Sequence, residues 1–185
     1  MNYGLLILII LAILVVWYIF SVCYRYKWKK PKCLKKRYGD GWVVITGASS
    51  GQGKQFAIEF AKRSFNLILI GSPRTQSVAD ILIKQYGIQI IVIVKNFNNS
   101  FERNFFEDIK QIVSDKKIVI LINNIGHRTG WVPSHKQPSH EINDTIACGT
   151  VVQSRLTHLL IPKLIESKGA IVFITAQCIG PSIFG

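Results

Sequence analysis

Hydrophobic residues follow two patterns along the chain. Residues 4–22, GLLILIILAILVVWYIFSV, contain no charged side chain, whereas short apolar runs alternate with mixed stretches from residue 42 onward. A helix rising about 1.5 Å per residue spans roughly 28 Å over residues 4–22, close to one hydrocarbon core. We therefore predict a transmembrane anchor at residues 1–23. A cleaved signal peptide is the alternative, which the lack of preceding basic residues and of a small-residue cleavage site disfavours.

The second pattern predicts five buried strands separated by helices, within a domain at residues 41–185. Each apolar run is short and continuous, whereas the segments between them carry apolar residues three or four positions apart. Continuous apolar strands that alternate with amphipathic helices are typical of a doubly wound parallel α/β sheet with both faces covered. The predicted strands are 42–46, 66–71, 88–94, 117–123 and 170–175; the predicted helices are 52–65, 76–86, 101–113 and 141–166, and a polar loop covers 127–140.

Charge is concentrated between the two patterns. Eight Lys or Arg residues and no acid occur between Arg25 and Arg37, in a chain whose net charge is +13. Basic residues beside an apolar span favour the cytosolic or matrix side and attract anionic lipid. We therefore predict a juxtamembrane linker at residues 24–40, with membrane lipid as its partner rather than nucleic acid, and the domain on the cytosolic or matrix side.

Cysteines and histidines add no site of their own. Cys23, Cys33, Cys148 and Cys178 show no CxxC spacing, which favours free thiols in a reducing compartment. The four histidines are scattered and form no metal-binding pattern. We therefore predict no metal site.

A glycine-rich turn follows the first predicted strand. Residues 43–62 read VVITGASSGQGKQFAIEFAK, so that a β-branched run meets three spaced glycines just before a helix. Glycine permits positive φ and close approach of backbone N–H groups to a pyrophosphate, which the N-terminus of the helix also favours. This position, in the first βα unit, predicts a dinucleotide site; a tight turn without a ligand is the alternative.

The spacing TGxxxGxG, together with Asn123-Asn124-Ile125-Gly126 after the fourth strand, resembles the short-chain dehydrogenase/reductase family. The stretches YGDGWVVITGASSGQGKQFA, IVILINNIG and LLIPKLIESKGAIVFIT behind an apolar span resemble its membrane-anchored very-long-chain 3-oxoacyl-CoA reductase and 17β-hydroxysteroid dehydrogenase group. The resemblance implies a Rossmann-like domain, shortened at the C-terminus, that binds NADP(H). It also implies the cofactor contacts Gly47, Ser49, Ser50, Gly51, Gln52, Gly53, Asn123 and Gly126.

Cofactor preference is expected at the end of the second strand. A carboxylate there would bind the ribose of NAD, and a basic residue would accept the 2′-phosphate of NADP. The chain has Ser72 at the position of the family's arginine and Arg74 two residues later, with no acid. Asn96 stands where the resemblance implies an aspartate beside the adenine. We therefore expect weak or vestigial binding, with NADP(H) preferred over NAD(H).

The resemblance also implies a catalytic serine, asparagine, tyrosine and lysine. Ala176 stands at the serine position, and Gly149 stands at the asparagine position. The tyrosine and lysine would fall beyond Gly185. We therefore expect no catalytic residue here, and a pseudoenzyme as the sequence stands.

Two other functions stay open. One is a structural or accessory subunit of a membrane complex, mitochondrial respiratory complexes included, with a protein partner that covers the incomplete sheet edge. The other is an active reductase whose C-terminal catalytic part lies outside this sequence. The resemblance implies the endoplasmic reticulum and fatty acid elongation, with the mitochondrial inner membrane as the alternative.

Overall fold

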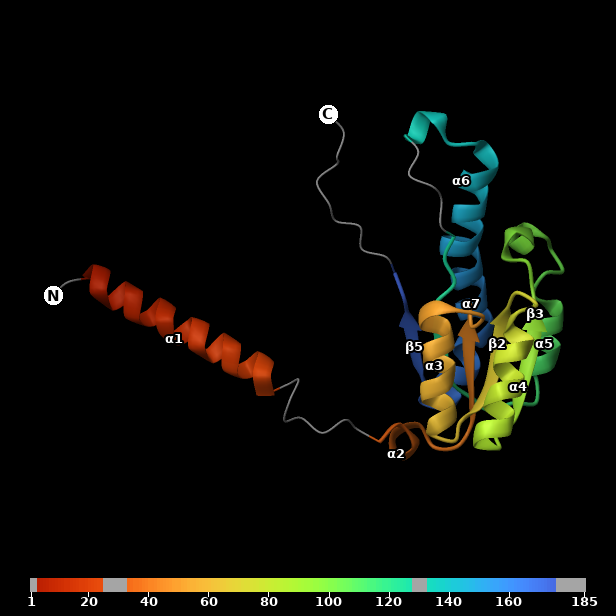
Figure 1. The fold of residues 1–185 in the computed structure, drawn as a ribbon, viewed down its shortest axis with the longest axis horizontal. Helices are drawn as coiled ribbons and strands as arrows, with labels where there is room; N and C mark the ends of the chain where they lie inside the picture. Colours follow the sequence, from red (N-terminus) through yellow and green to blue (C-terminus); the bar gives the residue numbers. More distant parts are fainter. Residues whose placement is uncertain (1–2, 25–32, 128–132, 176–185) are drawn as a thin grey trace. The chain divides into compact units, whose positions relative to one another are not determined.

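The chain divides into two units, residues 1–33 and 34–185, which we describe separately. This computed structural model describes residues 3–24, 33–127 and 133–175 (Figure 1). In the first unit, α1 (Tyr3–Cys23) is an uninterrupted helix with no buried residue. It is the one helix in the described residues that is long and apolar enough to cross a membrane, as judged by length and composition.

The second unit is built on a parallel sheet. The described residues form five strands in the order β3-β2-β1-β4-β5, and every pair of neighbours is parallel. This confirms the predicted doubly wound fold, in which the chain moves outward from β1 to one edge and then crosses to the other. The strands are β1 (Trp42–Thr46), β2 (Asn66–Gly71), β3 (Ile90–Val94), β4 (Ile118–Asn123) and β5 (Ala170–Phe173).

Helices cover both faces of the sheet. On one face, α3 (Gly51–Lys62) and α4 (Thr75–Tyr86) pack against Val43 and Ile45 of β1. On the other face, α5 (Glu107–Val113) and α7 (Gln153–Glu166) pack against Val44 (Figure 1). Successive strand residues point to opposite faces, so a strand buried on both faces reads as the continuous apolar run seen in the sequence.

The helix predicted at 101–113 is wrong in its first half. Residues 97–101 form a short 3₁₀ helix, η2 (Phe97–Phe101), and α5 begins only at Glu107. Phe97, Phe105 and Phe106 are all buried, whereas Phe101 is 56% exposed. One amphipathic stripe could not bury those three rings together, so the chain turns between the two helices instead.

The helix predicted at 141–166 is real but interrupted. It begins at Ser139, directly after Pro138, as α6 (Ser139–Ile146), so that it takes the last residues of the predicted 127–140 loop. That loop also contains η3 (Ser134–Lys136), and its residues 128–132 lie outside the described residues. A π-helical segment, η4 (Ala147–Val152), then separates α6 from α7. Such segments are rare and occur often at functional sites.

The segment predicted as a linker at 24–40 contains a short helix, α2 (Leu34–Tyr38), before β1. Leu34 and Tyr38 pack against the core on the α3 side. Lys35 forms an ion pair with Asp40 and lies 4.8 Å from the centre of the Phe65 ring. The end of this segment is therefore part of the folded domain, and residues 25–32 lie outside the described residues.

Candidate nucleotide-binding site

The glycine-rich turn has the geometry that its sequence predicts. Gly47 and Gly51 adopt φ values of +68° and +55°, which L side chains rarely adopt. A Cβ on Gly53 would lie 2.3 Å from the Gly47 carbonyl oxygen. The turn therefore packs its backbone directly against the first turn of α3, which leaves no room for a side chain.

The N-terminus of α3 keeps its N–H groups free of a side-chain cap. Ser50 is the N-cap residue, with extended backbone angles, and its hydroxyl makes no capping hydrogen bond. The first N–H groups of a helix have no partner within the helix, and together with the helix dipole they favour an anion. Ser50, Gly51 and Gln52 thus place polar backbone at the mouth of the turn, where Gly51 and Gln52 are exposed.

Asn124 connects this turn to the end of β4. Its Nδ2 donates to the carbonyl oxygens of Thr46 and Gly47, at 3.2 and 3.4 Å. The backbone N–H groups of Asn124 and Ile125 both donate to Thr46 Oγ1, at 2.9 and 3.1 Å. Thr46 and Asn124 lie within the two sequence motifs, but their hydrogen bonds could not be predicted from the motifs alone.

Asn123 occupies a different environment from its neighbour. It is fully buried at the end of β4, and its Nδ2 donates to Thr157 Oγ1 of α7 at 3.0 Å. Adjacent strand residues point to opposite faces of the sheet, so Asn123 faces the α7 side while Asn124 reaches the turn. In this structure Asn123 supports the sheet and does not line the cleft described next.

A cleft of about 480 Å³ lies over the carboxyl ends of β1, β2, β3 and β4. In a parallel α/β sheet, this edge, at the point where the strand order reverses, is where ligands bind. Six of the predicted cofactor residues line the cleft, whereas Ser50, Gly51, Gln52, Gly53 and Asn123 do not. The six are Gly47, Ser49, Ser72, Arg74, Asn96 and Gly126.

The polar groups of the cleft suit a phosphate better than a ribose diol. Arg74 is exposed and, within the described part of the chain, its side chain has no hydrogen bond or ion pair. Ser72 Oγ is buried and has no hydrogen-bond partner among the described residues. No aspartate or glutamate belongs to the described lining of the cleft. A buried hydroxyl without a partner and an unpaired guanidinium both favour an anionic ligand.

At the end of β3, the polar side chains that line the cleft are already engaged in contacts within the protein. Asn96 Oδ1 accepts a hydrogen bond from the Asn98 backbone N–H at 3.2 Å, which caps η2. Lys95 Nζ forms an ion pair with Asp108 at 2.7 Å and lies 4.8 Å from the centre of the Phe105 ring. Lys95 is therefore engaged elsewhere, and Arg74 is the cation of the cleft that is free to bind a ligand.

Cys148 of η4 is the thiol in this cleft. It is 4% exposed, and its Sγ lies 3.8 Å from Asn98 Oδ1. Burial, and secondarily the charge of Asp144, raises the pKa of the Cys148 thiol to about 11. The thiolate is the reactive form of cysteine, so Cys148 is protonated and inert at neutral pH. Sequence alone predicts only a free thiol at Cys148, because nothing local in the sequence places it beside the turn.

Two positions, Gly149 and Ala176, are those at which the resemblance implies catalytic residues, and the structure describes one of them. Gly149 lies in η4, and a Cβ there would meet no atom within 4 Å. Ala176 lies outside the described residues, two positions after Ile174, which donates its backbone N–H to Asn123 O. Gly149 thus leaves open space at the position where the resemblance implies an asparagine.

The sheet order, the glycine turn and the cleft at the carboxyl edge together define a Rossmann-like, dinucleotide-binding type of α/β domain. More narrowly, the chain belongs to the short-chain dehydrogenase family, whose model matches residues 41–180.

Curated relatives include proteins named as inactive and proteins named as reductases. The chain is 33% identical over 154 residues to the human "Inactive hydroxysteroid dehydrogenase-like protein 1", which covers 80% of this chain and 46% of that protein. It is 35% identical over 144 residues to the "Very-long-chain 3-oxoacyl-CoA reductase" of Phaeosphaeria nodorum, covering 74% of this chain and 41% of that protein. The chain therefore spans about half the length of the curated relatives that it matches.

Solved structures agree with this family. The bulky-bulky ketone specific alcohol dehydrogenase from Comamonas testosteroni matches with a TM-score of 0.66 and 26% identity, over 74% of this chain and 55% of that one. A short-chain dehydrogenase from Sphingobium yanoikuyae, solved in complex with NADPH, matches with a TM-score of 0.63 and 26% identity, over 74% and 54%.

Proposed function

We propose that this chain is a membrane-anchored, NADP(H)-binding member of the short-chain dehydrogenase family that lacks two of the reductase side chains. The observation that carries the proposal is the cleft, which keeps the glycine turn and free phosphate-binding groups, whereas the adjoining η4 has glycine at the family's asparagine position. The inactive hydroxysteroid dehydrogenase-like relatives support this combination.

The cleft supports NADP(H) rather than NAD(H). The Arg74 guanidinium and Ser72 Oγ, at the end of β2, are the groups that we assign to the 2′-phosphate of the adenosine ribose. The turn from Gly47 to Gly53 and the N-terminus of α3 would hold the pyrophosphate. NADPH, when bound, would supply a hydride; the chain's own residues bind and orient the nucleotide.

Loss of reductase activity rests on two residues. The family's asparagine holds a water of the proton relay and its serine orients the carbonyl, and Gly149 and Ala176 have neither an amide nor a hydroxyl to do so. A positioned general acid typically contributes about 10² to 10⁴-fold to a rate, and orientation adds more. We therefore expect cofactor binding without carbonyl reduction.

The test is a titration of the full chain in lipid nanodiscs with NADPH and NADH, followed by fluorescence. We expect NADPH to bind about tenfold more tightly than NADH, because only NADPH carries the phosphate that Arg74 can pair with. Arg74→Glu should remove this preference, whereas the matched control Lys84→Glu, at the opposite end of α4, should keep it. Millimolar NADPH without any binding would contradict the proposal.

Turnover separates a pseudoenzyme from an active reductase. The same nanodiscs are incubated with NADPH and either a long-chain 3-oxoacyl-CoA or a ketosteroid, and NADPH oxidation is followed at 340 nm. We expect no oxidation above the protein-free rate. If the wild type oxidises NADPH and the Gly53→Val variant does not, the chain is an active reductase instead.

A scaffold role is the second candidate, and a specific observation favours it. β5 is an edge strand of the described sheet, with Val172 36% exposed and Phe173 50% exposed. An exposed apolar edge is a template for a protein partner. Two results together would favour the accessory-subunit function over the nucleotide-binding one. NADPH would not bind at millimolar concentration, and a partner protein would cross-link to β5.

The anchor and its flanking charge support a single-pass membrane protein. α1 supplies the span, and the Lys and Arg residues that follow it favour a domain on the cytosolic or matrix side. We propose the endoplasmic reticulum as its compartment, which the family resemblance implies, with the mitochondrial inner membrane as the alternative.

A further inference from the structure

One end of the folded domain gathers basic side chains that are not used by the nucleotide site. It is the end at which the strands begin, opposite the cleft. Lys117 directly precedes β4, Lys168 lies in the turn before β5, and α2 precedes β1. We call this end the basic face and define it by six cations, namely Lys36, Arg37, Lys84, Lys117, Lys163 and Lys168.

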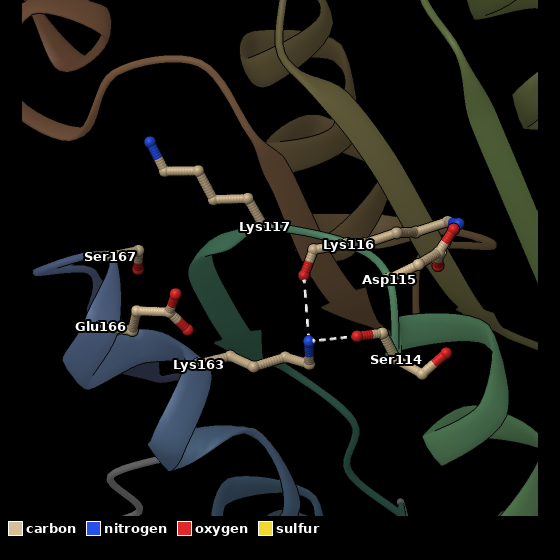
Figure 2. Close-up of a pocket in the computed structure, with 7 residues that line it drawn as sticks. All are labelled: Ser114, Asp115, Lys116, Lys117, Lys163, Glu166 and Ser167. Atoms are coloured by element: carbon tan, nitrogen blue, oxygen red, sulfur yellow. Dashed lines mark hydrogen bonds and ion pairs between the residues drawn. The ribbon is translucent and has the colours of Figure 1, made fainter.

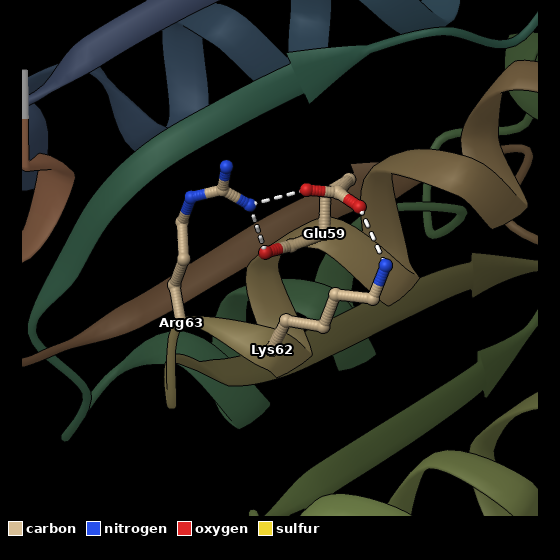
Figure 3. Close-up of polar contacts among 3 residues, drawn as sticks. All are labelled: Glu59, Lys62 and Arg63. Carbon is tan, nitrogen blue, oxygen red and sulfur yellow. Dashed lines mark hydrogen bonds and ion pairs between the residues drawn. The ribbon is translucent and has the colours of Figure 1, made fainter. Parts of the chain in front are cut away.

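The acids at this end are largely neutralised by other cations. Glu59 lies between Lys62 and Arg63, with its two oxygens 2.9 Å from Lys62 Nζ and 2.5 Å from Arg63 Nη1 (Figure 3). Hydrogen bonds from Arg63 and Lys62 lower the pKa of Glu59, so it is ionised and committed to these partners. Asp40 pairs with Lys35 in the same way, and Asp115 pairs with Lys116 at 2.9 Å.

The six cations that define the basic face have no ion pair among the described residues. A cleft of about 420 Å³ lies between Lys117, Lys163 and the end of α7, with Glu166 as its unpaired acid (Figure 2). Lys163 Nζ donates to the carbonyl oxygens of Ser114 and Lys116, at 2.6 and 3.3 Å, which fixes its position. Lys117 is exposed, and in Figure 2 its ammonium group points away from these carbonyls.

Helix dipoles explain part of this charge but not all of it. Lys84 and Lys163 lie in the last turns of α4 and α7, where a cation offsets the negative end of the dipole. Lys117 lies outside any helix, and Lys36 and Arg37 belong to a helix of five residues. Helix dipoles therefore do not account for Lys117, Lys36 and Arg37, and we look for a binding partner outside the domain.

We propose that the basic face docks on an anionic lipid surface, namely the membrane that holds α1. The proposal rests on the proposed membrane anchor. Residues 25–32 carry five more Lys or Arg and connect α1 to the segment that enters the domain at α2. Eight residues reach at most about 30 Å even when fully extended, so the start of α2 lies within reach of the headgroups. Anionic headgroups attract such a cluster within about one Debye length.

Docking in this way gives the domain an orientation. The nucleotide cleft lies at the carboxyl ends of the strands, and the basic face lies at their amino ends. With the basic face on lipid, the cleft opens to the aqueous phase, where a charged dinucleotide is dissolved. A nucleic acid offers a phosphate surface too, but the apolar helix beside the basic residues favours lipid.

The experiment measures lysine acylation by a membrane-impermeant reagent, read residue by residue by peptide mass spectrometry. The full chain is placed in nanodiscs of phosphatidylcholine alone or with about one third phosphatidylserine. We expect Lys36, Lys117 and Lys168 to react at least threefold more slowly in the anionic discs, with Lys54 and Lys136 unchanged. Raising NaCl to about 1 M should remove the protection, because the Debye length falls to about 3 Å.

Paired variants identify the face. Lys117→Glu/Lys168→Glu should abolish the protection of Lys36, whereas Arg103→Glu/Lys136→Glu, with the same change in charge, should preserve it; equal melting temperatures verify folding. If the chain does not co-purify with the discs, the proposed anchor is wrong. If the chain co-purifies but its lysines are acylated equally fast in both kinds of disc, the proposed docking is wrong. Protection by a DNA duplex but not by anionic discs would overturn the choice of lipid.

Discussion

At the residue scale, burial decides the chemistry of the one described thiol in the domain core. Cys148 lines the nucleotide cleft, where a reactive cysteine could act. Its thiol would need a lowered pKa to react, but no nearby cation among the described residues lowers that pKa. The nearby charge is the carboxylate of Asp144, which adds to the effect of burial in disfavouring the thiolate. Position in a cleft therefore does not by itself make a nucleophile.

We predict slow, strongly pH-dependent alkylation of Cys148. With its pKa raised to about 11, roughly one thiol in a thousand is ionised at pH 8, and the rate should rise about tenfold per pH unit up to that pKa. Cys33 is exposed and serves as the internal control, and mass spectrometry after iodoacetamide treatment gives both rates. NADPH should slow Cys148 further. Equal rates at the two cysteines at pH 8 would refute the prediction.

At the element scale, the site depends on how closely α3 approaches the β1 turn. The backbone of Gly53 touches the Gly47 carbonyl, and Asn124 ties both β1 and the turn to the end of β4. Thr46 Oγ1 accepts two backbone N–H groups from the residues after β4. The β1–α3 stretch and the distant end of β4 thus together set the shape of one anion-binding turn.

We predict that Gly53→Ala destabilises the fold by about 1–3 kcal/mol and weakens NADPH binding, because its Cβ would lie 2.3 Å from Gly47 O and 2.6 Å from Asn124 Nδ2. Gly149→Ala is the matched control, since nothing lies within 4 Å of its Cβ. Alanine in place of a helical glycine should stabilise by about 0.5–1 kcal/mol. Urea denaturation measures both. If the Gly53→Ala protein is as stable as wild type, the turn can shift to accept the Cβ and the prediction is wrong.

At the scale of the whole molecule, the domain has two unlike ends. Its carboxyl edge carries the cleft with the free Arg74, and its amino edge carries the basic face. In the proposed docking, lipid contact and nucleotide contact fall on these opposite edges of the domain. This arrangement depends on the side of the membrane on which the domain lies.

We predict that neither glycosylation sequon is modified when the chain is expressed in cells with an endoplasmic reticulum. Asn98 and Asn143 each begin a sequon and both are exposed, so a lumenal domain would offer them to the glycosylation machinery. A control with a cleavable signal peptide in place of residues 1–23 should be modified. A mass shift of the natural chain that an endoglycosidase removes would show the reverse orientation.

The sequence by itself determined the elements and the class of the protein. Continuous apolar runs and the 3.6-residue period of the helices are local properties, so the five strands, most helices and the apolar span could be predicted. The glycines of the turn were predictable too, because their conformational requirement is local. The helix breaks at residues 102–106 and 147–152 were missed, since burial of Phe105 and Phe106 and the π-helical segment depend on packing against other elements.

Only the tertiary structure decided which side chains meet. Asn123 and Asn124 are identical neighbours in sequence, yet one bonds Thr157 and the other the glycine turn, because the sheet places them on opposite faces. Likewise Cys148 enters the cleft, and Lys117 and Lys163 join one face, through contacts between elements far apart along the chain. Sequence spacing carries no record of such contacts, which exist only once the sheet has its strand order.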